Sequence, residues 1–174
     1  MKLAILDKDG TLAQPKSGSK FVQSPDDQEL MPGVKEAIAA LVADGYMLVI
    51  ASNQGGVEAG HKSLDDAIAE MRYCMKLLPE IERSYFCPDF AGQTCYMVLD
   101  QVIRTKTLSA TDWGFKSFRK PDPGMLLHAL WVFKIAYNVV GSVDVVYIGD
   151  RPEDEQASEA AGIPFIHADV WRKG

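Results

Sequence analysis

Short apolar runs alternate with amphipathic segments along the chain, and this pattern predicts strands that alternate with helices. Three apolar runs are typical of buried strands: 3–6, 46–51 and 143–148. Helical spacing of apolar residues predicts helices at 33–44 and 64–78, with Ser63 as a cap for the second. Further strands are expected at 84–87, 96–99 and 163–167, and further helices at 123–134 and 153–161. The alternation favours an α/β fold with a Rossmann-like, mainly parallel sheet and helices on both faces.

Two segments lack a clear pattern. Residues 13–30 are rich in Gln, Pro, Ser, Gly and Asp, and we expect a loop there. Residues 88–118 are harder to interpret and have room for a small insert. Because 174 residues is the size of one ordinary domain, we expect 1–174 to form a single domain without a large cap domain.

Composition narrows the class of protein. Hydrophobic residues make up 47% of the chain, enough for a core, and the net charge of −6 disfavours general binding to nucleic acid or to anionic membranes. No apolar run reaches the roughly 18–20 residues that span a bilayer. The N-terminal apolar run stops at Asp7, unlike a signal peptide, and three cysteines cannot all pair within the chain. We therefore expect a reduced, cytoplasmic protein with no membrane partner, and the oligomeric state is left open.

Acidic and hydroxyl side chains follow three of the predicted strands. Asp7 and Asp9 follow the first strand, Ser52 and Asn53 the second, and Asp150 the strand near the C-terminus. Because ligands bind beyond the carboxyl ends of parallel strands, we expect these side chains to meet at one edge. Converging carboxylates need a cation, and oxygen ligands suit Mg²⁺. The alternative for each position is an ordinary strand-ending turn, since Asp is a common turn former.

Four separated motifs resemble those of the haloacid dehalogenase superfamily of phosphatases, in the right order. Asp7-Lys8-Asp9-Gly10-Thr11 resembles the first motif, Ser52 the second and Lys120 the third, and 149–154 resembles the fourth, with Asp150 and Asp154 as its acid pair. The runs 52–56 and 119–125 resemble a small, typically capless subfamily. It includes histidinol-phosphatase, heptose-bisphosphate phosphatase and polynucleotide 3′-phosphatase domains.

This resemblance implies a magnesium-dependent phosphomonoester hydrolase that works through an aspartyl-phosphate. Asp7 would be the nucleophile and Asp9 the general acid and base. Asp7, the backbone carbonyl of Asp9, and Asp150 would hold Mg²⁺, while Asp154 would orient Lys120 or a metal-bound water. The expected phosphate-binding residues are Gly10, Thr11, Ser52, Asn53, Arg119, Lys120 and Arg151.

The chain departs from its sugar-phosphate relatives at a zinc knuckle that many of them carry between the second and third motifs. Cys87 and Cys95 remain, but Asp89 stands where a His is expected and no Cys precedes Arg119. Two thiols are too few for an ordinary four-ligand zinc site, so we do not expect zinc.

The expected substrate is a small phosphorylated metabolite such as a sugar phosphate. A nucleic-acid terminal phosphate or a nucleotide is the alternative, because 104–120 combines five basic residues and one acid with Trp113, Phe115 and Phe118. We favour a simpler interpretation of this segment, in which its aromatic residues cover the core. A phospho-accepting receiver-like domain and an inactive phosphate-binding module are alternatives of another class. The motif residues disfavour both, since Asp9 adds an acid/base that receivers do not need.

Overall fold

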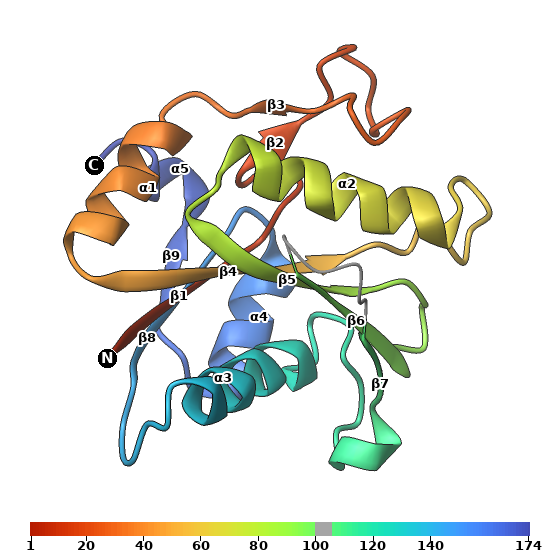
Figure 1. Cartoon of the computed structure of the whole chain (residues 1–174). Coiled ribbons are helices and arrows are strands. Elements are labelled where there is room, and N and C mark those ends of the chain that lie inside the picture. Colours follow the sequence, from red (N-terminus) through yellow and green to blue (C-terminus); the bar gives the residue numbers. More distant parts are fainter. Residues whose placement is uncertain (100–105) are drawn as a thin grey trace.

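The computed structural model describes residues 1–99 and 106–174, and in these residues seven strands form one sheet (Figure 1). Strands β5, β4, β1, β8 and β9 are parallel, and β6 and β7 continue the sheet in antiparallel pairing at one edge. Their order across the sheet, with bounds, is β7 (Lys106–Ser109), β6 (Thr94–Leu99), β5 (Ile81–Cys87), β4 (Tyr46–Asn53), β1 (Lys2–Leu6), β8 (Asp144–Gly149) and β9 (Phe165–His167). This confirms the predicted α/β fold with a mainly parallel sheet.

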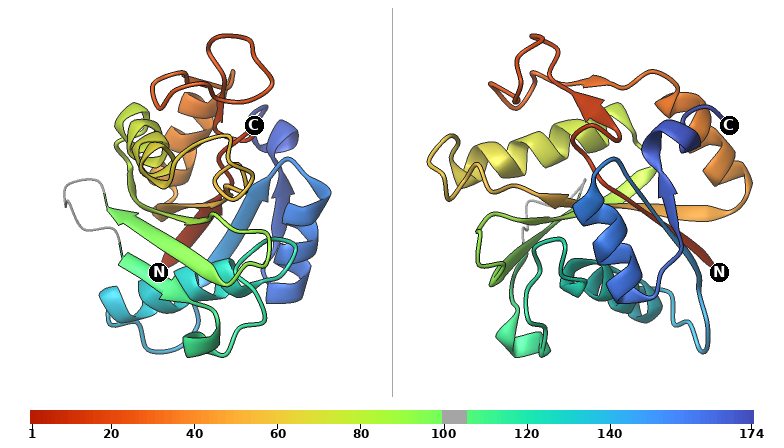
Figure 2. Two further views of the ribbon diagram at one scale, coloured as in Figure 1. Left: turned by 90° about the vertical axis from the view of Figure 1, so that its right-hand side faces the viewer. Right: turned by 180° about the vertical axis from the view of Figure 1, so that it is seen from behind.

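Helices cover both faces of the sheet, as Figures 1 and 2 show. One face carries α1 (Val34–Ala43), α2 (Leu64–Leu77) and the short α5 (Ala168–Trp171), and the other carries α3 (Gly124–Ala136) and α4 (Pro152–Ala161). Along β1, Ala4 and Leu6 face the first group of helices while Leu3 and Ile5 face the second, and all four are fully buried. A strand covered on both faces is apolar throughout, which explains the unbroken run in the sequence.

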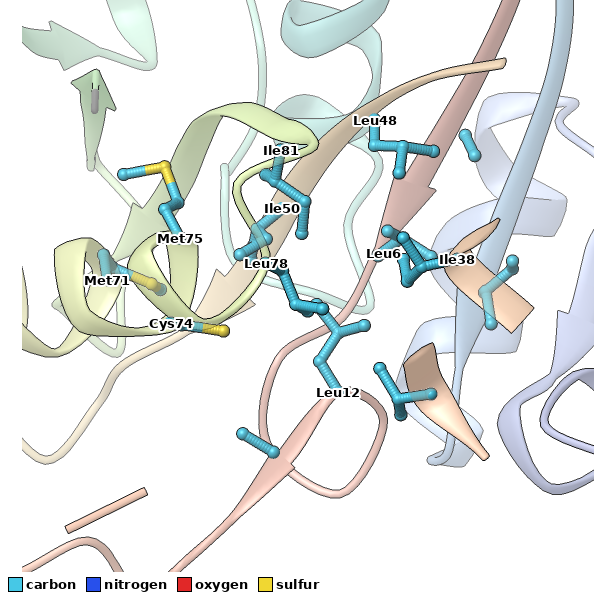
Figure 3. Close-up of a cluster of buried hydrophobic side chains, with 14 of the residues drawn as sticks. Leu6, Leu12, Ile38, Leu48, Ile50, Met71, Cys74, Met75, Leu78 and Ile81 are labelled. Carbon is cyan, nitrogen blue, oxygen red and sulfur yellow. The ribbon is translucent and has the colours of Figure 1, made fainter. Parts of the chain in front are cut away.

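The core on the α1–α2 side is drawn in Figure 3, where Leu6, Leu48 and Ile50 from the sheet face Ile38 of α1 and Met71 of α2. The sequence also explains where α2 begins. The Ser63 hydroxyl accepts a hydrogen bond from the Asp66 N–H at 3.0 Å, and the Asp66 carboxylate accepts one from the Ser63 N–H at 3.2 Å. The predicted cap at Ser63 is therefore confirmed.

Several boundaries differ from the prediction. Ser52 and Asn53 are the last residues of β4 and do not lie in a turn after it. Residues 13–30 were expected to be a loop, but they contain β2 (Ala13–Gln14) and β3 (Glu29–Leu30), which pair in antiparallel fashion. Strands of two residues are too short to produce an alternating pattern. The helix α5 was also missed, because four residues cannot show helical spacing.

The described part of 88–118 contains β6, β7 and a 3₁₀ helix at Thr111–Trp113, so this segment extends the sheet. Three of its aromatic residues, Trp113, Phe115 and Phe118, pack inward. Trp113 contacts the His128 and Trp131 rings, with centroids 4.5 and 4.4 Å away, and Phe115 contacts the fully buried Phe118 at 5.7 Å. For these three side chains, the expectation that they cover the core is confirmed. Residue 104, a basic position of the same segment, lies outside the described residues.

Within the described residues, no helix is both long enough and apolar enough to cross a membrane.

Candidate active site

The carboxyl ends of β1, β4 and β8 bring together residues that are far apart in the sequence. β1 lies between β4 and β8, and its last residue, Leu6, is in register with Ile148. Asp7 follows directly and donates its backbone N–H to the Ile148 carbonyl at 2.8 Å. Carboxylate oxygens of Asp7 and Asp150 lie within 4.8 Å of each other. The two acids thus meet at the edge of the sheet where ligands of such folds bind.

Lys120 reaches the same edge from the loop before α3 and pairs with two carboxylates. Its Nζ lies 2.6 Å from Asp7 Oδ1 and 2.7 Å from Asp154 Oδ1. It also donates to the Ala51 carbonyl at 3.0 Å and to the Tyr147 hydroxyl at 2.9 Å. Burial alone would lower the pKa of Lys120, but the charges of Asp7 and Asp154 outweigh burial and raise it. The ammonium therefore stays charged beside Asp7.

Asp154 supports Lys120 from the first turn of α4. Its Oδ1 also accepts a hydrogen bond from the Tyr147 hydroxyl at 2.8 Å, and its Oδ2 accepts one from the Arg151 backbone N–H at 3.1 Å. Burial would raise the pKa of Asp154, but the charge and hydrogen bond of Lys120 hold it below its ordinary value. One of its oxygens also lies within 4.8 Å of ligand atoms of Asp7 and Asp150, but both oxygens already have donors.

Asp7 lies in an environment that favours its neutral form. Burial raises its pKa from the ordinary value to about 7, with Lys120 lowering it and the charges of Asp154 and Asp9 raising it further. Burial also raises the pKa of Asp150. This edge therefore carries more carboxylates than Lys120 alone can neutralise, and a bound cation would stabilise their charged forms.

Asp9 lies two residues after Asp7 in the loop that follows β1, and its side chain is 38% exposed. Its Oδ1 pairs with the buried ammonium of Lys8 at 2.5 Å, and its Oδ2 accepts a hydrogen bond from Gln54 Nε2 at 2.6 Å. Burial would raise the pKa of Asp9, but the Lys8 charge and these hydrogen bonds hold it below its ordinary value. Gln54 Nε2 also lies 3.0 Å from Ser52 Oγ, so one amide connects Ser52 with Asp9.

The loop after β1 is held tightly against Asp150. Gly10 adopts φ 89°, and a Cβ at this position would collide with the Asp150 carboxylate, so only glycine fits. Thr11 is buried, and its hydroxyl donates to Asp150 Oδ1 at 3.3 Å. From the C-terminal end, Arg172 Nη1 donates to the Gly10 carbonyl at 3.0 Å and to the Thr11 carbonyl at 2.8 Å. The Thr11 side chain therefore contacts an expected metal ligand, and its hydroxyl already has a partner.

The sequence matches the family model described as polynucleotide kinase 3 phosphatase over residues 2–165. The chain belongs to this family. It is a phosphatase of the haloacid dehalogenase superfamily, as its four motifs predicted. This assignment favours an active phosphatase over the receiver-like domain and the inactive phosphate-binding module.

Individual relatives support the same assignment. The phosphatase is 28% identical over 163 residues to a D-glycero-D-manno-heptose-1,7-bisphosphate 7-phosphatase from Thermosynechococcus vestitus, covering 91% of this chain and 74% of that protein. It is 31% identical over 169 residues to a D-glycero-beta-D-manno-heptose-1,7-bisphosphate 7-phosphatase from Rhodopseudomonas palustris, covering 92% and 79%. Among solved structures it is similar to the D,D-heptose 1,7-bisphosphate phosphatase from B. bronchiseptica, with a TM-score of 0.62, 28% identity and coverage of 95% and 79%.

Two arginines of the phosphatase were expected to bind phosphate, and one of them, Arg151, lies 4.0 Å from the Asp150 carboxylate. The Arg119 guanidinium lies over the exposed Phe90 ring, 5.1 Å from its centroid, and a Cβ at Gly55 would touch both groups. Arg151 is more open, with a side chain that is 55% exposed and lies 3.7 Å from Glu153. The expected phosphate-binding residue Asn53 makes its side-chain hydrogen bonds to the backbone of Lys120.

The zinc-knuckle position of the phosphatase is filled by a hydrogen-bonded turn. Asp89 accepts hydrogen bonds from the backbone N–H groups of Gln93 at 2.8 Å and Thr94 at 3.0 Å. Cys87 and Cys95 are free, buried thiols, and burial raises the pKa of Cys87 to about 12. In the described part of the chain, neither thiol belongs to a group of three candidate metal ligands.

Sequence reasoning missed several residues that contact the site. Gln54 lies inside a recognised motif but was given no role, and Tyr147 reads as one more apolar residue of β8. Glu70 carried a usable sequence signal, because helical spacing places it on the same face of α2 as the apolar Ala67 and Cys74. The structure shows all three buried, with Glu70 only 2% exposed. An acid among apolar neighbours indicates a buried partner, which here includes Lys62.

Proposed function

We propose that this phosphatase hydrolyses a small sugar phosphate in a magnesium-dependent reaction that passes through an aspartyl-phosphate on Asp7. The observation that carries the proposal is the ion pair between Lys120 and Asp7, 2.6 Å long and buried at the edge where Asp150 also lies. A carboxylate beside a fixed cation can attack phosphorus, and the same cation can bind the phosphoryl oxygens.

The residues present suit Mg²⁺. Asp7 and Asp150 offer carboxylate oxygens within 4.8 Å of each other, and the backbone carbonyl of Asp9 would complete the protein ligands. Asp154 is better suited to orienting Lys120, because Lys120, Tyr147 and the Arg151 N–H occupy its oxygens. When bound, Mg²⁺ would supply the positive charge that lets an anionic carboxylate approach an anionic phosphate. The related structure from B. bronchiseptica is described as complexed with magnesium and phosphate.

The chain's own residues account for both halves of the reaction. In the first, a carboxylate oxygen of Asp7 forms a bond to phosphorus while the bond to the leaving oxygen breaks. Lys8 and Gln54 favour the ionised form of Asp9 in the free protein, so Asp9 would take up a proton from solvent as the anionic substrate binds and then give it to that oxygen. In the second, Asp9 takes a proton from the water that attacks the same phosphorus, and the Asp7 carboxylate is released. Lys120, Ser52 and the backbone amide of Asn53 would hold the phosphoryl oxygens throughout.

The remaining expected phosphate ligands divide into two groups. Arg151 lies beside Asp150, and Arg119 directly precedes Lys120 in the chain and lies over Phe90; both would contact substrate groups beyond the reacting phosphate. Gly10 and Thr11 lie against Asp150, so we assign them to holding the loop and the metal-site carboxylate in place. We further infer that 1–174 acts as one catalytic unit in which loops select the substrate.

The names of the relatives support one substrate class. The curated relatives from T. vestitus and R. palustris are named for a heptose 1,7-bisphosphate, which supports a sugar phosphate as the substrate. The family description names a polynucleotide, but the net charge of −6 does not favour broad contact with nucleic acid.

A panel of phosphate esters tests the proposal. It contains heptose 1,7-bisphosphate, other sugar phosphates, histidinol phosphate, nucleotides and DNA ends with 3′- or 5′-phosphates, each with Mg²⁺ and with a chelator. We expect magnesium-dependent phosphate release that is fastest with a sugar phosphate, and none from Asp7→Asn. Preference for a DNA end would replace the sugar by the nucleic-acid alternative, and undiminished turnover by Asp7→Asn would overturn the role of Asp7.

A further inference from the structure

Asp9 belongs to a closed ring of five polar side chains. Of these, only Asp9 and Lys8 lie in the first motif. From Asp9, the ring passes through Lys8 to Glu70 of α2, then to Lys62, to Gln54 and back to Asp9. The four charged members alternate in sign, so the ring carries no net charge. Glu70 and Lys8 are 2% and 0% exposed, which means that each buried charge depends on its neighbours in the ring.

Lys62 determines which way the Gln54 amide points. Its Nζ donates to Gln54 Oε1 at 3.0 Å. Because an ammonium can only donate, this contact fixes the amide oxygen toward Lys62 and aims the Gln54 NH₂ group at the other side. On that side Nε2 donates to Asp9 Oδ2 at 2.6 Å and lies 3.0 Å from Ser52 Oγ. The direction of the amide at Asp9 is thus set by a lysine that does not touch Asp9.

Glu70 controls both lysines of the ring. Its two oxygens each lie 2.7 Å from Lys62 Nζ, and Oε2 lies 3.8 Å from Lys8 Nζ. Lys8 is held more closely by Asp9, at 2.5 Å. Without the Lys62 charge, Glu70 would be a buried carboxylate with Lys8 as its nearest cation. Glu70 would then attract Lys8 away from Asp9. At the same time Gln54 would lose the contact that fixes the direction of its amide.

We propose that Lys62 and Glu70, acting through Gln54 and Lys8, are positioning residues that hold the Asp9 carboxyl in place for proton transfer to the leaving group. The inference rests on the proposed role of Asp9 as general acid and base. It adds that this role depends on Lys62, between β4 and α2, and on Glu70 within α2, both outside all four motifs. Both oxygens of Asp9 have a donor, which restricts rotation of the carboxyl group.

The test compares two substrates that differ in their need for an acid. The leaving group of p-nitrophenyl phosphate departs without a proton, whereas the alcohol of a sugar phosphate requires one. We expect Lys62→Met to lower kcat/KM for the fastest sugar phosphate about tenfold to a hundredfold, and for p-nitrophenyl phosphate less than about threefold. Asp9→Asn should show the same selectivity more strongly, and Lys62→Arg should restore most of the sugar-phosphate activity.

The ratio of the two activities is independent of how much protein is folded, since both are measured on one preparation. The double variant Lys62→Met with Glu70→Gln removes the buried unpaired charge and provides a second folded sample with the same expected selectivity. Lys76→Met, an exposed lysine of α2, is the matched control and should leave the ratio unchanged. Equal losses on both substrates in the Lys62 variants would overturn the inference while Asp9→Asn remains selective. A non-selective Asp9→Asn would instead overturn the proposed role of Asp9, and the inference with it.

Discussion

The Asn53 side chain clasps the backbone of Lys120 from both sides. Its Nδ2 donates to the Lys120 carbonyl at 3.0 Å, and its Oδ1 accepts from the Lys120 N–H at 3.1 Å, across 67 positions of sequence. The residue at the end of β4 therefore fixes the turn from which the Lys120 ammonium reaches Asp7. These two hydrogen bonds hold the second motif, at the end of β4, against the third motif at Lys120.

Removing this clasp should weaken both the fold and the reaction. In Asn53→Ala, the N–H and carbonyl of Lys120 lose their partners, which costs about 1–3 kcal/mol of unfolding free energy. The displaced Lys120 should lower kcat about tenfold or more. Thermal unfolding and phosphate release measure the two effects. Gln14→Ala, which removes an amide on the outer side of β2, is the control, and an Asn53→Ala enzyme with the wild-type kcat would show that the clasp does not position Lys120.

Lys120 should be needed for folding stability as well as for phosphate binding. In Lys120→Met, the buried carboxylates of Asp7 and Asp154 lose their shared cation, so we expect a loss of about 3–5 kcal/mol in chemical denaturation. Adding Asp154→Asn to the same chain should recover part of that stability and none of the activity. A single variant as stable as the wild type would contradict the buried ion pairs.

The fold could be predicted where a strand is buried on both faces. The runs that became β1, β4 and β8 are apolar because helices cover both sides of the sheet, and the residues that follow them meet at one edge. The paired strands β2 and β3 and the helix α5 could not be predicted. Segments of two to four residues are too short to show a periodic pattern of apolar residues. Their formation depends on the surrounding tertiary structure.

The candidate site could likewise be predicted in part, where its residues stand in recognisable motifs. Asp7, Asp150 and Lys120 stand in motifs at strand ends or turns, where polar residues are conspicuous, and the structure brings them together. Tyr147 and Arg172 lie in or beside regular elements, and their roles depend on partners that are distant in sequence. Local pattern cannot reveal such partners, because one hydroxyl or guanidinium fits many surroundings equally well.

The raised pKa of Asp7 predicts how stability changes with pH in metal-free protein. Its pKa is about 7 in the folded chain and has its ordinary, lower value in the unfolded chain, so between these values the folded state binds more protons. The contribution of Asp7 to stability is then present at low pH and decreases as the pH rises toward about 7. Denaturant unfolding of wild type and Asp7→Asn across this range measures it as the difference between the two curves.

Mg²⁺ should oppose this trend, because the proposed site binds the ionised form of Asp7. Added Mg²⁺ should stabilise the wild type increasingly as the pH rises and should have little effect on Asp7→Asn. Without Mg²⁺, a difference in unfolding free energy between wild type and Asp7→Asn that stays constant with pH would show that Asp7 does not titrate in this range. An equal Mg²⁺ effect on both would place the metal away from Asp7.

Arg172 should affect catalysis from beyond the region that matches the family model, which ends at residue 165. It binds the carbonyls of Gly10 and Thr11, so its loss frees the loop that carries Asp7 and Asp9. We expect Arg172→Ala to lower kcat about tenfold with a small change in melting temperature, and added methylguanidinium to restore part of the activity. Lys173→Gln, an exposed neighbour, is the control. A parallel fall in activity and melting temperature without rescue would mean that Arg172 only stabilises the C-terminal end, because a residue that positions the loop should be replaceable by its free side-chain analogue.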